Sequence, residues 1–320
     1  MASARESIAA LVEELAPGGR LVRSRRLRGG VGARMDVLDI ERVDGTRFKV
    51  SLRRFASDDR HAARFSKPEH VAHEYRILEL VKDADLPAPR PLLLDAEGRL
   101  FGVPAIVLTY LPGRPLYIPR DLSSWANDLA AALLATHAVT PERFDLSWLS
   151  VHLRDGIREE LEKRREYAEQ DGPLARQVHA VLEAEIDRIR WPEACFVHDD
   201  YWPGNTVWQR GKLTGLIDWT HAELGDPRTD VSQCRIDLAL ILGSHAADAF
   251  RDAYQARASR PLPDLWYFDL FRGMRALLSY QHWLAGYHDA GLTHVTPSHA
   301  RERIEAFLRP APPTSEPPTA

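Results

Sequence analysis

Residues 195–230 read CFVHDDYWPGNTVWQRGKLTGLIDWTHAELGDPRTD, and this stretch decides the fold predicted for the chain. Two apolar residues lead into a His-Asp-Asp run, and Asn205 follows the second aspartate, Asp200, by five positions. Residues 206–217 are largely apolar on both sides of an Arg-Gly-Lys turn, which predicts a β-hairpin. The hairpin delivers Asp218 at its end. The stretch therefore predicts a polar loop, a short hairpin and a carboxylate, in that order.

These residue types suit the transfer of a phosphoryl group. Such a transfer needs positioning and neutralisation of charge more than covalent assistance. Mg²⁺ prefers oxygen ligands, usually one or two carboxylates together with phosphates and waters, so Asn205 and Asp218 are the predicted metal ligands. Asp200 is the predicted catalytic residue, because a second carboxylate can orient an acceptor hydroxyl and take its proton.

The same stretch resembles the aminoglycoside phosphotransferase-like small-molecule kinases, a family that includes choline kinase-like enzymes and has a fold related to that of protein kinases. Their motif is H-G-D-x-x-x-x-N followed by I-D-W or I-D-F, and this chain has HDDYWPGN and then Ile217-Asp218-Trp219. The resemblance extends over residues 21–308. It implies an ATP-dependent small-molecule O-phosphotransferase that uses Mg²⁺ and takes a small-molecule hydroxyl acceptor as its partner. The residues do not distinguish ATP from GTP.

Several residues in this region are expected to have structural roles. The resemblance makes His198 a residue that shapes the loop, and it implies that Asp230 braces the loop from the start of a helix. Asp199 stands where the family usually has glycine, and no chemical role is assigned to it. Cys195 and Cys234 are interpreted as small buried apolar residues.

A cation and a carboxylate partner are predicted in the N-terminal part. The sequence VSLR at residues 50–53 lies on a predicted strand and lines up with the kinase V-A-I-K, which places Arg53 at the phosphate-binding cation position. Arg54 would point to the opposite face of the strand, so Arg53 is preferred over it. Glu74, on a helix predicted over residues 68–83, is the implied partner of the cation. A surface ion pair is the structural alternative.

Two further nucleotide contacts follow from the resemblance. Gly30 and Gly32 lie between the first two predicted strands, where backbone N–H groups would face phosphates. The full G-x-G-x-x-G is not present, because Met35 occupies the third glycine position. Tyr110 and Leu111 resemble the hinge whose backbone contacts the adenine edge.

The alternation of hydrophobic periods defines the expected architecture. Five short strands and one main helix precede residue 111, and helical periodicity dominates after it. The expected class is α+β, a bilobal protein-kinase-like fold with an N-terminal antiparallel sheet and a mostly helical C-terminal lobe. Residues 1–111 are the expected nucleotide-binding lobe and residues 112–308 the catalytic and acceptor-binding lobe. Residues 309–320, rich in Pro, Ser, Thr and Ala, are an expected disordered tail.

Composition excludes several other classes of function. The chain has 320 residues, and its hydrophobic share of 44% and charged share of 28% are those of an ordinary globular enzyme. A net charge of -4 offers no strong positive field, so a nucleic-acid partner is not expected. The apolar runs are far shorter than the ~20 residues that span a bilayer, so no membrane partner is expected. With two cysteines and no signal-like start, the expected location is the cytoplasm, and no oligomeric state is indicated.

Three other functions are alternatives at this point. A nucleotide-binding pseudokinase would act as a sensor or scaffold without turnover. A protein kinase needs a long activation segment, and the 12 positions from Asp218 to Asp230 leave no room for one. A metal-dependent hydrolase would use His198, Asp199, Asp218 and His221, but a second histidine cluster with suitable spacing is missing.

The acceptor is not defined by the sequence, so aminoglycosides, macrolides, other antibiotics, choline-like alcohols and sugar metabolites all stay open. Carboxylates and aromatic residues lie close together in the C-terminal region, which would suit a cationic amine. A solvated face over a packed helical core explains the same residues, and this second interpretation is favoured. The residues concerned are Glu223, Asp226, Asp264, Asp269, Trp266, Tyr267, Trp283 and Tyr287.

Overall fold

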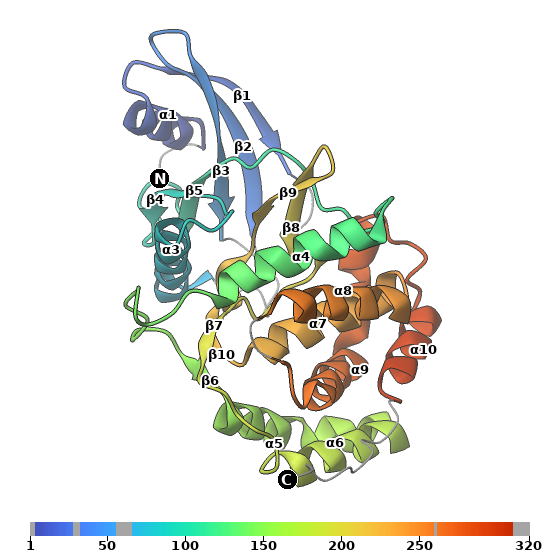
Figure 1. The fold of residues 1–320 in the computed structure, drawn as a ribbon. Coiled ribbons are helices and arrows are strands. Elements are labelled where there is room, and N and C mark those ends of the chain that lie inside the picture. Colours follow the sequence, from blue (N-terminus) through green and yellow to red (C-terminus); the bar gives the residue numbers. More distant parts are fainter. Residues whose placement is uncertain (1–3, 28–32, 56–65, 259–260, 310–320) are drawn as a thin grey trace. The chain divides into compact units, whose positions relative to one another are not determined.

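The computed structural model describes residues 4–27, 33–55, 66–258 and 261–309, and the chain forms two compact units. The first unit combines Met1–Pro115 with Asn205–Thr220, and the second combines Leu116–Gly204 with His221–Ala320. The predicted α+β class is confirmed, with an N-terminal antiparallel sheet and a helical C-terminal region (Figure 1). The functional division predicted at residue 111 stays a prediction.

A five-stranded antiparallel sheet forms most of the first unit. Its strands lie in the order β1-β2-β3-β5-β4, so β3 is central and is paired with β2 and β5. Pairing on both edges fixes the orientation of β3, so its successive side chains lie on opposite faces of the sheet. The strands are β1 (Arg20–Arg26), β2 (Arg34–Glu41), β3 (Arg47–Arg54), β4 (Pro91–Asp95) and β5 (Ala105–Thr109).

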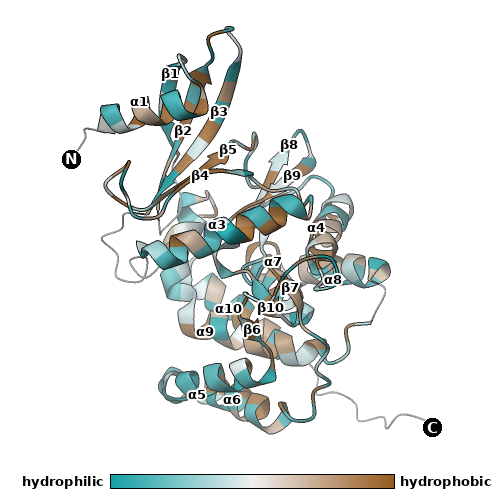
Figure 2. Ribbon diagram, turned by 90° about the vertical axis from the view of Figure 1, so that its left-hand side faces the viewer, coloured by the Kyte–Doolittle hydropathy of each residue, from teal (hydrophilic) through white to brown (hydrophobic). Residues whose placement is uncertain are grey.

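Two helices accompany this sheet. Helix α1 (Ala4–Leu15) buries Leu11 and Val12 against the apolar residues of β2, β3 and β5, which form one core. Helix α3 (Pro68–Asp83) has the bounds predicted from the sequence, with proline in its first turn, and it packs near β4 and β5. Along these strands, brown (hydrophobic) segments alternate with teal and white ones in Figure 2, as expected for strands with one face in a core. Burial of apolar area in this core is the main stabilising contribution in the first unit.

The predicted hairpin is confirmed, and it folds with the first unit although it lies far along the chain. Strands β8 (Thr206–Gln209) and β9 (Lys212–Leu216) are joined by Arg210 and Gly211, both left-handed, as a tight two-residue turn requires. Leu216 N–H donates to the Pro87 carbonyl at 2.6 Å. Backbone pairing between Arg114 and Trp208 also ties the hairpin to the segment after β5.

The second unit is mainly helical. Helices α5, α6, α7, α9 and α10 contribute to one continuous hydrophobic core, in which Tyr267, Phe268 and Phe271 of α9 are fully buried. Most of α5 is teal, hence hydrophilic, in Figure 2. The helices are α4 (Leu122–His137), α5 (Arg154–Asp171), α6 (Pro173–Glu185), α7 (Pro227–Ile241), α8 (Ser244–Arg257), α9 (Leu265–Asp289) and α10 (Pro297–Phe307).

A small sheet in the second unit leads the chain into its polar loop. Strand β10 (Glu223–Gly225) pairs in parallel with β6 (Val151–His152) and antiparallel with β7 (Cys195–Val197). The loop with Asp200 follows β7, and helix α7 follows β10, so both start from the same sheet. None of the helices in the described part of the chain combines the length and apolarity that crossing a bilayer requires.

Candidate active site

Three of the predicted site residues meet in the first unit. Arg53 lies on β3 and Glu74 on α3, and the Arg53 Nη1 group donates to Glu74 Oε1. The other terminal nitrogen, Nη2, donates to Asp218 Oδ1 at 3.3 Å. Arg53 therefore bridges a carboxylate of the α3 helix and the carboxylate that follows the β8–β9 hairpin. We call Arg53, Glu74 and Asp218 the bridging cluster.

The neighbouring Arg54 is outside this cluster. Its guanidinium donates to Asp36 Oδ2 on the adjacent strand β2. Successive side chains of a strand lie on opposite faces, and this geometry separates Arg53 from Arg54 as the sequence predicted. In the described part of the chain, Asp218 is contacted by Arg53 and not by Arg54.

Burial sets the electrostatics of the bridging cluster. Burial raises the pKa of Glu74 above its ordinary value, although Arg53 acts in the opposite direction. Burial alone would lower the pKa of Arg53, but Glu74 and Asp218 outweigh it, so the pKa of Arg53 is raised. The guanidinium is therefore charged at every working pH. A fixed cation stands beside an exposed carboxylate, which is an arrangement suited to a polyphosphate.

Asn205 lies at the same end of the hairpin as Asp218. The Asn205 carbonyl accepts the Ile217 N–H at 2.9 Å, so Asn205 is paired with the residue that precedes Asp218. Asp218 has a left-handed backbone (φ 63°), a 44% exposed side chain and a hydrogen bond of 2.8 Å from Thr220 Oγ1. A carboxylate and an amide oxygen are donors that suit Mg²⁺. Thr220, which sequence reasoning missed, also bonds to Glu74.

The predicted adenine-contacting residues, Tyr110 and Leu111, directly follow β5. The Tyr110 N–H donates to the Lys49 carbonyl at 3.3 Å, and Leu111 packs on β9. Gly215 of β9 makes room for it, because a Cβ at that position would lie 2.3 Å from Leu111 Cδ1. The segment with Tyr110 and Leu111 is thus held against the hairpin. The predicted phosphate-binding residues Gly30 and Gly32 lie outside the described residues.

The predicted catalytic residue, Asp200, lies in the second unit, in a loop anchored by Asp230. The Asp230 carboxylate is fully buried at the start of α7. Its two oxygens accept the backbone N–H groups of His198 and Asp199, each at 2.8 Å. His137 of α4 lies at 3.1 Å from the same carboxylate. Asp230 therefore braces the loop before Asp200, as the sequence analysis expected.

Arg272 is a residue of this loop's surroundings that the sequence analysis did not find. It lies on α9, is fully buried, and its guanidinium donates to Asp199 Oδ1. A signal was present, because Arg272 lies between the apolar residues Phe271 and Met274 on the buried side of α9. Pattern alone gives no partner for such a residue.

The four carboxylates considered for a cationic acceptor each have partners within the second unit. Asp226 forms a buried pair with Arg228, and Asp269 pairs with Arg235. Glu223 lies 3.2 Å from His152, and Asp264 accepts the Arg190 N–H. These contacts favour the structural interpretation of the four.

Asp237 on α7 is a buried carboxylate that the sequence analysis missed. Burial raises its pKa to about 6, although hydrogen bonds from Tyr287 and Gln233 and the charge of Arg272 act in the opposite direction. A part of the titration of this buried carboxyl group therefore falls near neutral pH.

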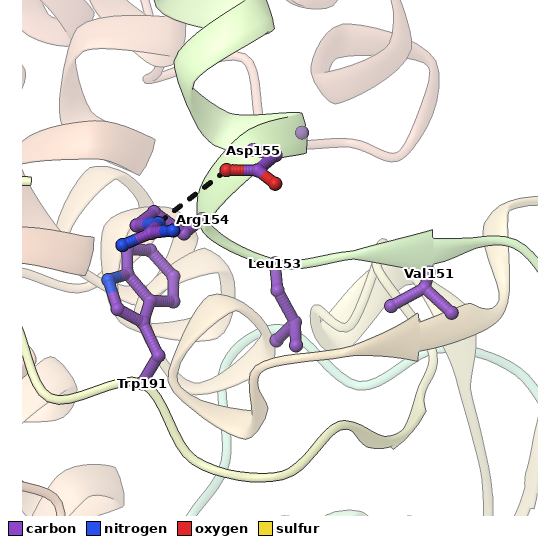
Figure 3. A pocket seen from close by; sticks show the side chains of 6 residues that line it. Val151, Leu153, Arg154, Asp155 and Trp191 are labelled. Carbon is purple, nitrogen blue, oxygen red and sulfur yellow. Dashed lines mark ion pairs between the residues drawn. The ribbon is translucent and has the colours of Figure 1, made fainter.

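A cavity of about 380 Å³ lies elsewhere in the second unit (Figure 3). It is formed where β6 meets the first turn of α5, and Figure 3 shows Val151, Leu153 and Trp191 lining it together with the Arg154–Asp155 ion pair. None of the predicted site residues lines it.

The four-residue metal site of the hydrolase alternative finds no support in the structure. No group of three or more His, Cys, Asp or Glu in the described ranges is placed to hold a metal.

The antiparallel sheet, the cation on β3 paired with a helix carboxylate, and the braced loop ahead of an Asp-bearing hairpin define a kinase-like protein. The sequence model of the phosphotransferase enzyme family matches residues 40–277, which is most of the chain. The chain therefore belongs to this family of ATP-dependent phosphotransferases, or kinases.

Individual relatives agree with this assignment. A homoserine kinase of Mesorhizobium japonicum is 32% identical over 129 residues, which is 39% of this chain and 39% of that kinase. The chain thus matches well under half the length of this curated relative. The solved structure of macrolide 2′-phosphotransferase type I is 17% identical, with 97% of this chain and 99% of that chain covered and a TM-score of 0.62.

A third relative carries ligands. A thermostable mutant of the aminoglycoside phosphotransferase APH(4)-Ia, in ternary complex with ADP and hygromycin B, is 16% identical, with 94% of this chain and 98% of that chain covered and a TM-score of 0.60. At these identities the two solved structures show that the fold is shared.

Proposed function

We propose that this protein transfers the γ-phosphate of ATP to a hydroxyl group of a small molecule with the help of Mg²⁺, and that it does so in the cytoplasm. The observation that carries the proposal is the bridging cluster, in which Arg53 contacts both Glu74 and Asp218. The cluster places a permanent cation next to an exposed carboxylate in a chain of the phosphotransferase family.

The nucleotide would be held by the first unit. Arg53, kept in place by the buried Glu74, would bind the α- and β-phosphates through its planar set of donors. Backbone groups of Tyr110 and Leu111 would contact the adenine edge, and the N–H groups of Gly30 and Gly32 the phosphates. The relative that binds ADP supports a nucleotide of this kind.

Asn205 and Asp218 are the residues that would hold Mg²⁺, and their donor set fits the ion. Both supply oxygen atoms, and one or two protein ligands suffice because phosphates and waters complete the coordination. When bound, the ion neutralises charge on the transferred phosphoryl group and the leaving ADP. Asp218 is half-exposed and so is open to such a ligand, while Thr220 fixes one of its oxygens.

Asp200 would act on the acceptor. Its carboxylate accepts a hydrogen bond from the acceptor hydroxyl and takes its proton as the hydroxyl oxygen bonds to the γ-phosphorus. The bond from the γ-phosphorus to the bridging oxygen breaks, and ADP leaves with both electrons of that bond. Asp230 supports this role because it fixes the backbone of the two residues before Asp200.

A small acceptor suits this chain better than a protein. Only β10 and the short segments around it lie between Asp218 and Asp230, so no long segment is present there to dock a peptide. The relatives are named for a macrolide, an aminoglycoside and homoserine, all of which are hydroxylated small molecules. The particular acceptor of this chain follows from none of them.

The test is acceptor-dependent release of ADP from MgATP across a panel of macrolides, aminoglycosides, homoserine and other hydroxylated metabolites. The variant Asp200→Asn should lower the rate with the best acceptor by about 10²–10⁴-fold, with ATP affinity unchanged. The matched control is Asp252→Asn, because Asp252 is an exposed residue of α8 that contacts Arg251. Equal turnover by Asp200→Asn would remove Asp200 from the mechanism. ATP binding without turnover on the whole panel would favour a pseudokinase.

A further inference from the structure

The residue immediately before Asp200 has an unusual backbone. Asp199 is left-handed, with φ 59°, a conformation in which the Cβ of an L-residue is crowded and which glycine adopts freely. Aspartate is among the non-glycine residues that tolerate it best. The family resemblance puts glycine at this position, whereas this chain has an acidic side chain there.

That side chain has a dedicated partner. The Arg272 guanidinium donates to Asp199 Oδ1, and the Arg272 side chain is 1% exposed, against 16% for Asp199. Burial alone would lower the pKa of Arg272, but Asp199 and then Glu160 outweigh it, so its pKa is raised. Among the described residues, Arg272 Nε and Nη1 have no hydrogen-bond partner. The charge of this buried arginine is thus tied to Asp199.

Anchors lie on both sides of Asp200. Before it, the Asp199 N–H donates to Asp230 Oδ1 and the Asp199 side chain is held by Arg272. After it, the hydroxyl of the fully buried Tyr201 donates to the Leu129 carbonyl at 2.8 Å. A residue between two such anchors has its Cα–Cβ direction fixed by its neighbours. Misplacement of a reacting group by about 1 Å can cost about 10²-fold in rate.

We propose that Arg272 is a positioning residue, which holds Asp199 in its left-handed conformation through their ion pair and thereby aims the Asp200 carboxylate. The proposal rests on the proposed role of Asp200 as the group that takes the acceptor proton. Arg272 does not touch substrate in this account. The ion pair replaces, in this chain, the freedom that glycine gives the loop elsewhere in the family.

The test compares the wild type with the charge-neutral double variant Asp199→Asn/Arg272→Met. Neutralising both partners avoids leaving a single buried charge, which is the usual reason that one-sided variants fail to fold, and Asn tolerates the left-handed backbone. Hydrogen exchange of the peptide over residues 196–202 should become at least about 10-fold faster, because the loop loses an anchor. The kcat for acceptor phosphorylation should fall about 10–100-fold, with the Kd for ATP within about twofold.

The matched control is the pair Arg235–Asp269, which joins α7 to α9 and has its α9 partner about one turn before Arg272. Its atoms Nε and Oδ1 lie 3.1 Å apart, and both side chains are largely buried. The variant Arg235→Met/Asp269→Asn removes a comparable ion pair that does not contact the loop. It should lower thermal stability by a similar amount, with loop exchange and kcat unchanged.

The outcomes distinguish a failure of the proposed role of Arg272 from a failure of the proposed function. A folded Asp199→Asn/Arg272→Met variant with wild-type loop exchange and wild-type kcat would overturn the proposal. A fall in kcat equal to that of the control variant would also overturn it, since a general loss of stability would then explain both. If the double variant does not fold, Arg272→Lys and Asp199→Asn replace it, and wild-type exchange and kcat in both would overturn the proposal. Absence of turnover by the wild type would refute the proposed function, whereas loop exchange would still decide whether Arg272 fixes the loop.

Discussion

The bridging cluster of the first unit and the Asp200 loop of the second unit hold their acidic residues in different ways. In the first unit, Asp218 is contacted by side chains, Arg53 at 3.3 Å and Thr220 at 2.8 Å, and is 44% exposed. In the second unit, the backbone N–H groups of the loop bond to the fully buried Asp230, and the Asp199 side chain pairs with the buried Arg272. A ligand can therefore displace the side-chain partners of the exposed Asp218. The contacts of Asp230 are buried and are not available to a ligand.

This difference matches the two tasks in the proposed reaction. In each cycle a nucleotide with its metal must bind, contact the charged groups of the bridging cluster and dissociate again. The residue that takes the acceptor proton needs a fixed direction throughout the cycle. Stability and activity should therefore be separable at the bridging cluster and inseparable at Asp230, and this contrast can be tested.

The largest effect is expected for Asp230→Ala. Its removal leaves the buried N–H groups of His198 and Asp199 without an acceptor, and each such loss costs about 1–3 kcal/mol. The free energy of unfolding should therefore fall by about 2–6 kcal/mol, with phosphate transfer abolished. Urea denaturation and an ADP-release assay measure the two. Asp230→Asn keeps one acceptor oxygen and should lose less of both. A stable Asp230→Ala variant with normal turnover would show that the loop does not need this brace.

The next effect concerns Arg53. Arg53→Met should lower kcat/KM for ATP by about 10²–10³-fold, as expected for the loss of a preorganised charge donor at the reacting phosphates. It also leaves Glu74 buried without its cation, so stability should fall as well. The double variant Arg53→Met/Glu74→Gln should recover the stability but none of the activity. Recovery of both would mean that the pair is only structural.

The sequence predicted the elements whose patterns are local. The helix over residues 68–83 was predicted at its observed bounds, because a proline opens it and a Pro-Ala-Pro segment follows it. Strand alternation separated Arg53 from Arg54, and the motif spacing located Asp218 at the end of a hairpin. Each of these inferences needs only the period of the chain or a few neighbouring residues.

The partners formed across long sequence distances were not predictable in this way. Arg272 and Asp199 are 73 positions apart, and Tyr287 and Asp237 are 50 positions apart. Neither pair can be recognised from sequence periodicity. A single polar residue on a buried helix face is compatible with many partners. The tertiary packing of α9 against α7 and against the loop before Asp200 decides which groups meet. Where the site chemistry depends on such pairs, only the folded chain shows it.

The smallest effect is a change in how stability depends on pH. Burial raises the pKa of Asp237 from 3.8 to about 6, so the native state holds this proton more tightly than the unfolded chain does. The contribution of Asp237 to the free energy of unfolding therefore decreases as pH rises from about 4 to about 6 and stays low above that. Asp237→Asn removes this dependence. Relative to the wild type, its stability should rise by about 2–3 kcal/mol between pH 4 and pH 7, as measured by urea denaturation at each pH.

Tyr287→Phe provides the matched comparison for this prediction. The Tyr287 hydroxyl donates to Asp237 Oδ1 and so lowers the pKa of that carboxyl group. Without it, the pKa of Asp237 should rise further, and the decrease in stability should extend to higher pH than in the wild type. Parallel stability curves for the wild type and Asp237→Asn from pH 4 to pH 7 would show that Asp237 ionises in the native state as it does in the unfolded chain. Asp237 would then behave as an accessible acidic group, as Asp218 does. The fixed arrangement of the second unit would in that case be limited to the Asp200 loop.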